Sequence, residues 1–227
     1  MEISNSAKTT QSVPTVFLWL FVGYTILGAV TLLFISKGDI VLYFNENYTS
    51  FLDSFFKWYT KLADGVVAIL LVVVLILFVG INKGVLAGLC FVSTGLISFA
   101  LKRLFFYDSF RPKSVFYAIQ DQLHFVEGVS MKVDFSFPSG HTISGMAIAT
   151  VFAFLIQKKA VQYTFFFFGF MIGVSRMYLF QHFFVDTYVG TLLSVTICYF
   201  IISWYTKISL STNEKLDKGL YYLLKSK

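Results

Sequence analysis

Six long apolar segments constrain the fold of this chain more than any other feature of its sequence. A transmembrane helix needs about 20 mostly apolar residues, and the segments that approach this length are residues 16–36, 65–81, 84–101, 139–156, 163–180 and 183–205. Charged residues make up 13% of the 227 residues, about half of the ~25% that soluble domains carry. The sequence therefore excludes the soluble and disordered classes and predicts an all-α integral membrane bundle of six transmembrane helices.

The chain shows no internal repeat, linker or second domain, so we expect a single membrane domain over residues 1–227. Residues 16–36 are too long for the apolar part of a signal peptide and lack a following cleavage site, so we expect a retained span. Residues 102–138 form a long charged loop. In the connection 37–64, residues 51–62 carry apolar side chains at helical spacing. This pattern fits an amphipathic helix in the membrane interface and a cap packed on the spans equally well.

The charges outside the spans predict the orientation. Six spans put both termini and the short turns at 82–83 and 157–159 on one side, which collects nine basic and three acidic residues and therefore the whole formal net charge of +6. Because basic short loops stay inside, we expect cytoplasmic termini and outer long loops. The short, single-domain chain leads us to expect a bacterial inner (cytoplasmic) membrane. No basic cluster interleaved with polar side chains points to nucleic acid, and nothing indicates an oligomeric state.

Polar residues at span ends are costly to place and are therefore candidates for function. Here they form three clusters, each at the outer end of a span. The first cluster follows the third span and contains Lys102, Arg103 and Arg111. These cations fit a phosphate site, and they fit basic side chains that extend from a helix end toward water equally well.

The second cluster is the sequence Phe-Pro-Ser-Gly-His at residues 137–141, where the fourth span begins. Ser139 is a typical N-cap residue, and Gly140 allows the backbone to approach a ligand closely. The first N–H groups of a helix lack partners and bind anions. A plain cap explains Ser139, but it does not explain His141 beside it at the membrane boundary.

The third cluster joins the fifth and sixth spans and contains Arg176, His182 and Asp186. His182 and Asp186 are four residues apart, so a helix places them on one face, where Asp186 can orient the imidazole as a nucleophile. A buried ion pair that holds the helices in register is the structural alternative. Arg176 offers a bidentate fork for phosphate. Together, the three clusters supply what phosphoryl transfer through a phosphohistidine needs, without a set of metal ligands.

These motifs resemble the signature of the type 2 phosphatidic acid phosphatase (PAP2) superfamily, which shares its site with vanadium haloperoxidases. The second motif, P-S-G-H, matches at residues 138–141, and the third, S-R-x5-H-x3-D, matches from Ser175 to Asp186. The first motif, K-x6-R-P, departs from the pattern, because eight residues separate Lys102 from Arg111 and the expected lysine position holds Leu104. The resemblance covers about residues 60–205 and implies a six-helix bundle of the PAP2 and haloperoxidase-like type.

The resemblance also implies roles for the motif residues. His182 would be the nucleophile, Asp186 its orienting partner, and His141 the general acid and then the base. The phosphate would be bound by Lys102, Arg111, Ser139, Gly140 and Arg176. Lys102 is preferred to Arg103 for the first cation, Ser175 is expected to support the site only, and His124 is expected to be an ordinary loop residue. No metal, vanadium or other cofactor is expected.

The expected activity is hydrolysis of a membrane lipid phosphate or pyrophosphate. The resemblance offers undecaprenyl pyrophosphate, phosphatidylglycerophosphate, phosphatidic acid and lipid A phosphates as substrates, and the sequence does not choose among them. A lipid phosphotransferase would use the same residues. A transporter is the alternative from another class, but it would place ionisable groups near the middle of the spans.

Overall fold

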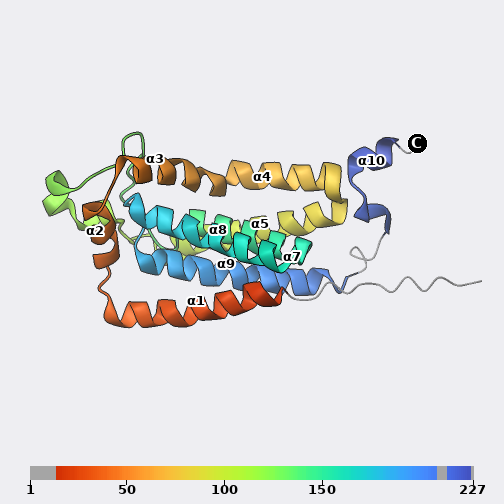
Figure 1. The fold of residues 1–227 in the computed structure, drawn as a ribbon, viewed down its shortest axis with the longest axis horizontal. Helices are drawn as coiled ribbons and strands as arrows, with labels where there is room; N and C mark the ends of the chain where they lie inside the picture. Colours follow the sequence, from red (N-terminus) through yellow and green to blue (C-terminus); the bar gives the residue numbers. More distant parts are fainter. Residues whose placement is uncertain (1–13, 209–213, 226–227) are drawn as a thin grey trace, which may run out of the picture.

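The computed structural model describes residues 14–208 and 214–225. Figure 1 shows long helices that run along the long axis of the molecule. They are α1 (Thr15–Phe34), α4 (Gly65–Val74), α5 (Ile81–Ala100), α7 (Gly140–Ile156), α8 (Lys159–Tyr178) and α9 (Phe184–Tyr205). A π-helical turn extends α4 (η2, Leu75–Val79), and another extends α5 (η3, Leu101–Phe105). No strand occurs among the described residues, so the predicted all-α class is confirmed.

Three of these helices are long and apolar enough to cross a membrane alone: Thr15–Phe34, Ile81–Phe105 and Phe184–Tyr205. Residues Ser50–Ala63 and Gly65–Val79 pass the same test only as a pair that is bent by 53°. Helix α7 is apolar but shorter. Apolar helices of this kind fit a multi-pass membrane protein. The count of six spans stays a prediction, although each predicted span corresponds to one long helix within a few residues.

Helix α7 lies at the centre of the bundle, in contact with α5, α8 and α9. Small residues let its neighbours approach closely, as is common in membrane bundles. A Cβ on Gly145 of α7 would lie 2.9 Å from Ile172 of α8, and one on Gly169 of α8 would lie 2.6 Å from the sulfur of Met146. This close packing fixes the N-terminus of α7 relative to the end of α8.

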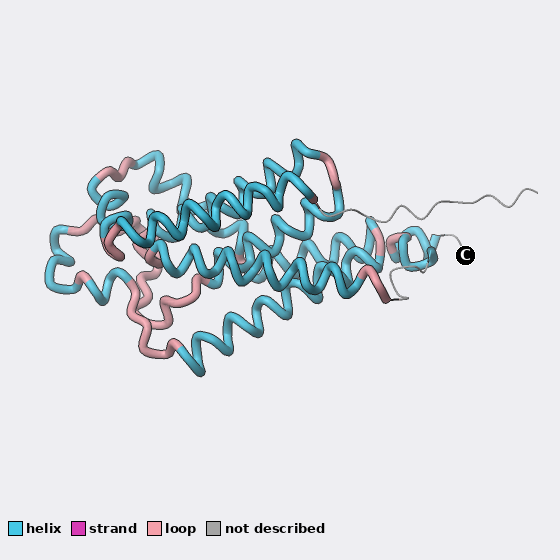
Figure 2. Tube along the Cα trace, turned by 90° about the horizontal axis from the view of Figure 1, so that it is seen from below, coloured by secondary structure: helices cyan, strands magenta, loops and turns pink. Residues whose placement is uncertain are grey.

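The connections gather at the two ends of the bundle. One end carries α2 (Asp39–Glu46), α3 (Ser50–Tyr59), η1 (Thr60–Ala63), α6 (Pro112–Val115) and η4 (Tyr117–Gln122). Figures 1 and 2 show the opposite end with the α4–α5 turn and the C-terminal helix α10 (Leu220–Lys225). There the Asn82 amide donates to the carboxylate of Asp217 in η6 (Glu214–Asp217) at 3.1 Å. The short turns thus share an end with the C-terminal residues. Lys8 and Lys227, also counted for that side, lie outside the described residues.

The segment at 51–62 forms α3 and part of η1. One face packs on α8, where Phe56 lies against Tyr178 with ring centroids 4.7 Å apart and the Tyr59 hydroxyl donates to the Phe168 carbonyl at 3.2 Å. The other face exposes Phe51 and Trp58. The segment therefore packs on the helices as a cap and also presents the apolar face of an interfacial helix.

Candidate active site

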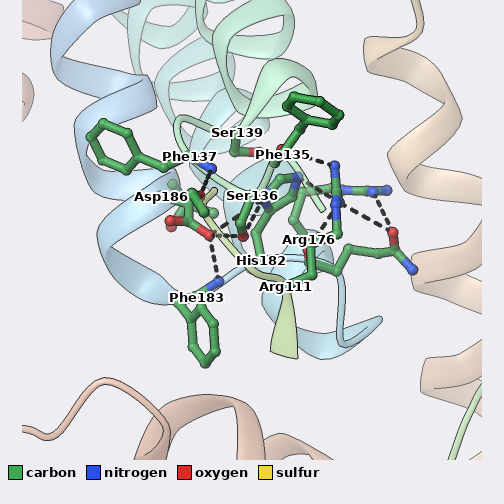
Figure 3. A network of polar contacts seen from close by, with 12 residues as sticks. Arg111, Phe135, Ser136, Phe137, Ser139, Arg176, His182, Phe183 and Asp186 are labelled. Carbon is green, nitrogen blue, oxygen red and sulfur yellow. Dashed lines mark hydrogen bonds and ion pairs between the residues drawn. The ribbon is translucent and has the colours of Figure 1, made fainter. Parts of the chain in front are cut away.

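The three predicted clusters meet at the end of the bundle that carries the long loops. Helix α7 contributes its first turn, α8 its last turn, and α9 its first turn. The loop at 102–138 closes over them (Figure 3). The Ser139 N–H donates to the Asp186 carbonyl at 3.0 Å, and the Arg111 guanidinium donates to the Gln181 carbonyl at 2.9 Å. These contacts tie the loop and the starts of α7 and α9 to one another.

His182 lies between a carboxylate and a guanidinium. Its Nδ1 is 3.4 Å from the Asp186 carboxylate, and its Nε2 is 3.0 Å from Nη1 of Arg111 (Figure 3). A guanidinium has no acceptor, so Arg111 donates and Nε2 accepts. The proton of the neutral ring is therefore on Nδ1, facing Asp186, and the lone pair on Nε2 accepts the bond from Arg111.

Asp186 is held by two further donors. The Ser136 hydroxyl donates to Oδ2 of Asp186, and the Phe183 N–H donates to the same oxygen at 3.0 Å. Asp186 thus caps α9 while its carboxylate faces His182. Ser136 lies outside every predicted motif, and its burial among these groups becomes visible only in the structure.

The imidazole of His182 is only 2% exposed, in the loop between α8 and α9. Burial, followed by the charges of Arg111, Arg176 and Lys102, holds the pKa of His182 well below its ordinary value. Both effects disfavour the protonated ring. At neutral pH the ring is neutral, which is the form in which a histidine can act as a nucleophile.

Arg111 and Arg176 approach the site from the loop and from α8. Carbonyls of Asp134 and Gln181 hold Arg111, at 2.8 and 2.9 Å. Burial lowers the pKa of Arg111, but a guanidinium stays charged in proteins. Arg176 donates from Nη1 to the Thr60 hydroxyl at 2.9 Å, while its buried Nε has no hydrogen-bond partner among the described residues. An unpartnered buried N–H on a cation is a donor available to an anion.

The start of α7 adds an open backbone surface. Ser139 is the N-cap, and its hydroxyl oxygen accepts from the Thr142 hydroxyl at 2.9 Å. A Cβ built on Gly140 would meet nothing within 4 Å. The first turn of α7 therefore has space beside it, with N–H groups available to an anion.

Lys102 and Arg103 point to different surroundings. The Lys102 ammonium donates to the Phe135 carbonyl at 2.7 Å, next to Ser136 and therefore beside Asp186. The Arg103 guanidinium instead stacks over the Phe135 ring, 4.3 Å from its centroid. The lysine thus reaches the site, while the arginine packs on the outside of the loop segment.

His141 has a partner that the sequence analysis missed. Its Nε2 lies 3.3 Å from Oδ1 of Asp64, the residue between η1 and α4. Asp64 belongs to no family motif. The available signal was an acidic residue at the outer end of a predicted span, directly before Gly65. Thr60 and Gln181, which hold Arg176, were missed as well.

His124 lies in a second cluster outside the site. It bonds Asp53 at 2.8 Å and stacks on Tyr48, with ring centroids 3.6 Å apart. The Tyr178 hydroxyl also donates to Asp53, at 2.6 Å. These contacts tie the loop at 102–138 to α3 and α8. Among the described residues, no group of His, Cys, Asp and Glu is arranged to hold a metal ion.

Known proteins resemble this chain in sequence and in fold. A model of the PAP2 superfamily matches residues 83–209. The structure is similar to the crystal structure of LpxE from Aquifex aeolicus, with 25% identity, a TM-score of 0.62 and coverage of 74% of this chain and 94% of that one. It also shares its fold with a transmembrane PAP2-type phosphatidylglycerolphosphate phosphatase from Bacillus subtilis, with 20% identity, a TM-score of 0.61 and coverage of 87% and 98%. The comparison with curated proteins finds no match.

Proposed function

Because this chain belongs to the PAP2 superfamily, we propose that it is a membrane phosphatase that hydrolyses a lipid phosphate or pyrophosphate through a phosphohistidine. One observation carries the mechanism: Nδ1 of His182 faces the carboxylate of Asp186 at 3.4 Å, while its Nε2 lies 3.0 Å from the Arg111 guanidinium, which can only donate. A bound phosphate would take over the Arg111 donor and leave Nε2 free to attack phosphorus.

In the first half-reaction, Nε2 of His182 attacks phosphorus and the bond from phosphorus to the lipid oxygen breaks. His141 gives its proton to that oxygen, so the lipid leaves as an alcohol, or as a monophosphate when the substrate is a pyrophosphate. Asp186 stabilises the charge that develops on the ring of His182 by accepting from Nδ1. The products of this step are a phosphohistidine and a neutral His141.

In the second half-reaction, neutral His141 takes a proton from water while the water oxygen attacks phosphorus. The bond from phosphorus to Nε2 breaks, inorganic phosphate leaves, and both histidines return to their starting protonation states. The phosphate oxygens would be held in both steps by Lys102, Arg111, Arg176 and the N–H groups at Ser139 and Gly140. These donors favour the charge on the equatorial oxygens in the transition state. No step of this mechanism requires a metal.

A lipid substrate is supported by an apolar groove of about 390 Å³ between α4 and α5. Its lining reaches Ser144 of α7, one turn after His141, and includes Gly88, Gly95 and Phe91 of α5. A lipid chain in this groove would leave its head group near the site. Undecaprenyl pyrophosphate, phosphatidic acid and lipid A phosphates stay candidates, and the named substrate of the Bacillus neighbour adds weight to phosphatidylglycerophosphate.

We further propose that the site faces the outside of a bacterial inner membrane, with cytoplasmic termini. The basic turns at the opposite end of the bundle support this orientation. The cations Lys102, Arg111 and Arg176 lie at one end of the bundle. This position argues against a transporter, whose binding residues lie near the membrane midplane.

The test is phosphate release from a panel of lipid phosphates by the purified protein, in the presence of a chelator. His182→Ala should abolish release, and His124→Ala, which removes the histidine outside the site, should retain it. With ³²P-labelled substrate, the parent should form an acid-labile phosphoprotein. Release that survives the loss of His182 would overturn the mechanism, and absence of release from every lipid would favour the transporter. Transfer of phosphate to an added alcohol would identify a phosphotransferase.

A further inference from the structure

The side chain of Asp64 does not cap the helix that it begins. It is the N-cap residue of α4, where an aspartate side chain normally accepts an N–H of its own helix. The Asp64 side chain makes no such capping bond. Its carboxylate lies instead 3.3 Å from Nε2 of His141, on a different helix. The carboxylate is therefore directed toward the site rather than toward the helix that it begins.

The surroundings of His141 are otherwise positive. Four cations act on His141 electrostatically: Arg176 of α8, Lys132 and Arg111 of the loop, and Lys102 of η3. His182 lies within electrostatic reach as well. The carboxylate of Asp186 accepts hydrogen bonds from the Ser136 hydroxyl and the Phe183 N–H. Among the described residues, Asp64 is the only carboxylate in ion-pair contact with His141.

We propose that Asp64 is a positioning residue for His141, whose Nε2–H it accepts so that Nδ1 faces the leaving oxygen of the substrate. The proposal rests on the phosphatase function proposed above. A carboxylate that fixes the tautomer of a functional histidine from behind is a recurring arrangement. The two histidines of the site would then use opposite ring nitrogens: Nε2 of His182 for phosphorus, and Nδ1 of His141 for the proton.

This arrangement serves both half-reactions. In the first, His141 carries protons on both nitrogens, gives the one on Nδ1 to the leaving oxygen, and keeps the one on Nε2 bonded to Asp64. In the second, Nδ1 takes a proton from the attacking water while Nε2–H stays in place. Asp64 also offsets the surrounding cations, so that a larger fraction of His141 is protonated when the lipid leaves.

The exposure of the pair argues against a purely structural role. The Asp64 side chain is 53% exposed and that of His141 is 33% exposed. Ion pairs this open to solvent contribute little to stability. Asp64→Asn should therefore fold with a melting temperature close to that of the parent, while its rate of phosphate release falls.

The kinetic test compares Asp64→Asn with the parent on two phosphate esters. An alkyl phosphate has a leaving oxygen that needs a proton, whereas nitrophenyl phosphate releases a stable anion. We expect kcat/KM of Asp64→Asn for the alkyl ester to fall by about 10- to 100-fold, and kcat/KM for nitrophenyl phosphate to fall far less. In the pH profile of kcat/KM for the alkyl ester, the alkaline limb should move to lower pH. Asp64→Glu should recover part of the activity, and Asp121→Asn, which removes an exposed carboxylate from η4, should match the parent. Equal losses on both esters, or an unmoved alkaline limb, would overturn the proposal.

A second measurement does not depend on turnover. The chain contains three histidines, so ¹⁵N-histidine labelling gives three ring signals, which His124→Gln and His141→Gln assign. In Asp64→Asn the pH midpoint at which His141 protonates should move to lower pH, with the signal of His124 unchanged. An unmoved midpoint would overturn the role of Asp64 even in an active enzyme. A shifted midpoint in a protein that releases no phosphate would instead count against the proposed function alone.

Discussion

Asp186→Asn separates the orienting role of this carboxylate from its packing. The amide has the same size, but the Phe183 N–H, the Ser136 hydroxyl and Nδ1 of His182 all face the same carboxylate oxygen, Oδ2. Where the NH₂ group takes the place of that oxygen, it favours the ring of His182 with the proton on Nε2, because an amide nitrogen only donates. That tautomer has no lone pair for phosphorus. In the Ser-His-Asp hydrolases, the equivalent change lowers kcat by about 10⁴-fold.

The structure predicts a smaller loss here. Arg111 lies 3.0 Å from Nε2 and only donates, so it opposes a proton on that atom. A hydrogen bond to a charged group contributes about 1.5–3 kcal/mol, and 1.4 kcal/mol corresponds to a factor of ten at 25 °C. The Arg111 contact should therefore recover roughly 10- to 100-fold of the ~10⁴-fold loss, which leaves a decrease in kcat of about 10²- to 10³-fold.

The assay is steady-state phosphate release at neutral pH, together with a melting curve. Asp53→Asn is the matched control, because it alters a second histidine–aspartate pair, with His124 at 2.8 Å, away from the site. The control should keep kcat within a few-fold of the parent. A loss below 10-fold for Asp186→Asn, or an equal loss for Asp53→Asn, would refute the assignment of Asp186 as the orienting carboxylate.

Three further predictions follow from the geometry. Gly95→Leu, which puts a side chain into the lipid groove where a Cβ meets nothing within 4 Å, should raise KM for long-chain substrates but not for short-chain ones. Gly23→Leu, equally unobstructed on α1, is its control, and equal effects on both chain lengths would contradict a lipid site. Lys102→Ala should lower kcat/KM at least tenfold more than Arg103→Ala, since Lys102 contacts the carbonyl beside Ser136 whereas Arg103 stacks on the Phe135 ring; the reverse order would exclude Lys102 as the phosphate ligand. Because the pKa of His182 is held below its ordinary value, the unfolded chain binds more protons there below pH ~6.5. Melting temperature should therefore fall more steeply from pH 7 to 5 in the parent than in His182→Gln, and parallel slopes would contradict the burial of a neutral ring.

The sequence predicted the helices well because apolar runs and helix ends are local properties. Each predicted span corresponds to a helix, and residues 139–141 begin α7 as the cap pattern indicated. The sequence also predicted that the residues of the three motifs lie close together, because the family motifs contain residues that share one site. It missed Asp64 and Ser136, whose roles depend on contacts with residues 77 and 50 positions away in the chain. Such contacts carry no periodicity, and a lone acid or serine at a loop boundary has many ordinary explanations.

The departure from the first family motif has a structural explanation in η3. The chain has two more residues between Lys102 and Arg111 than the family pattern allows. Residues Leu101–Phe105 form a π-helical turn, closed by a bond from the Phe106 N–H to the Leu101 carbonyl at 2.9 Å. A π-helical turn holds one more residue than an α-helical turn and often occurs at functional sites. It takes up part of the extra length at the end of α5, and the loop before Arg111 takes up the rest. The wider turn explains how Lys102 reaches the Phe135 carbonyl while Arg103, the next residue, stacks on the outer face of the same phenylalanine.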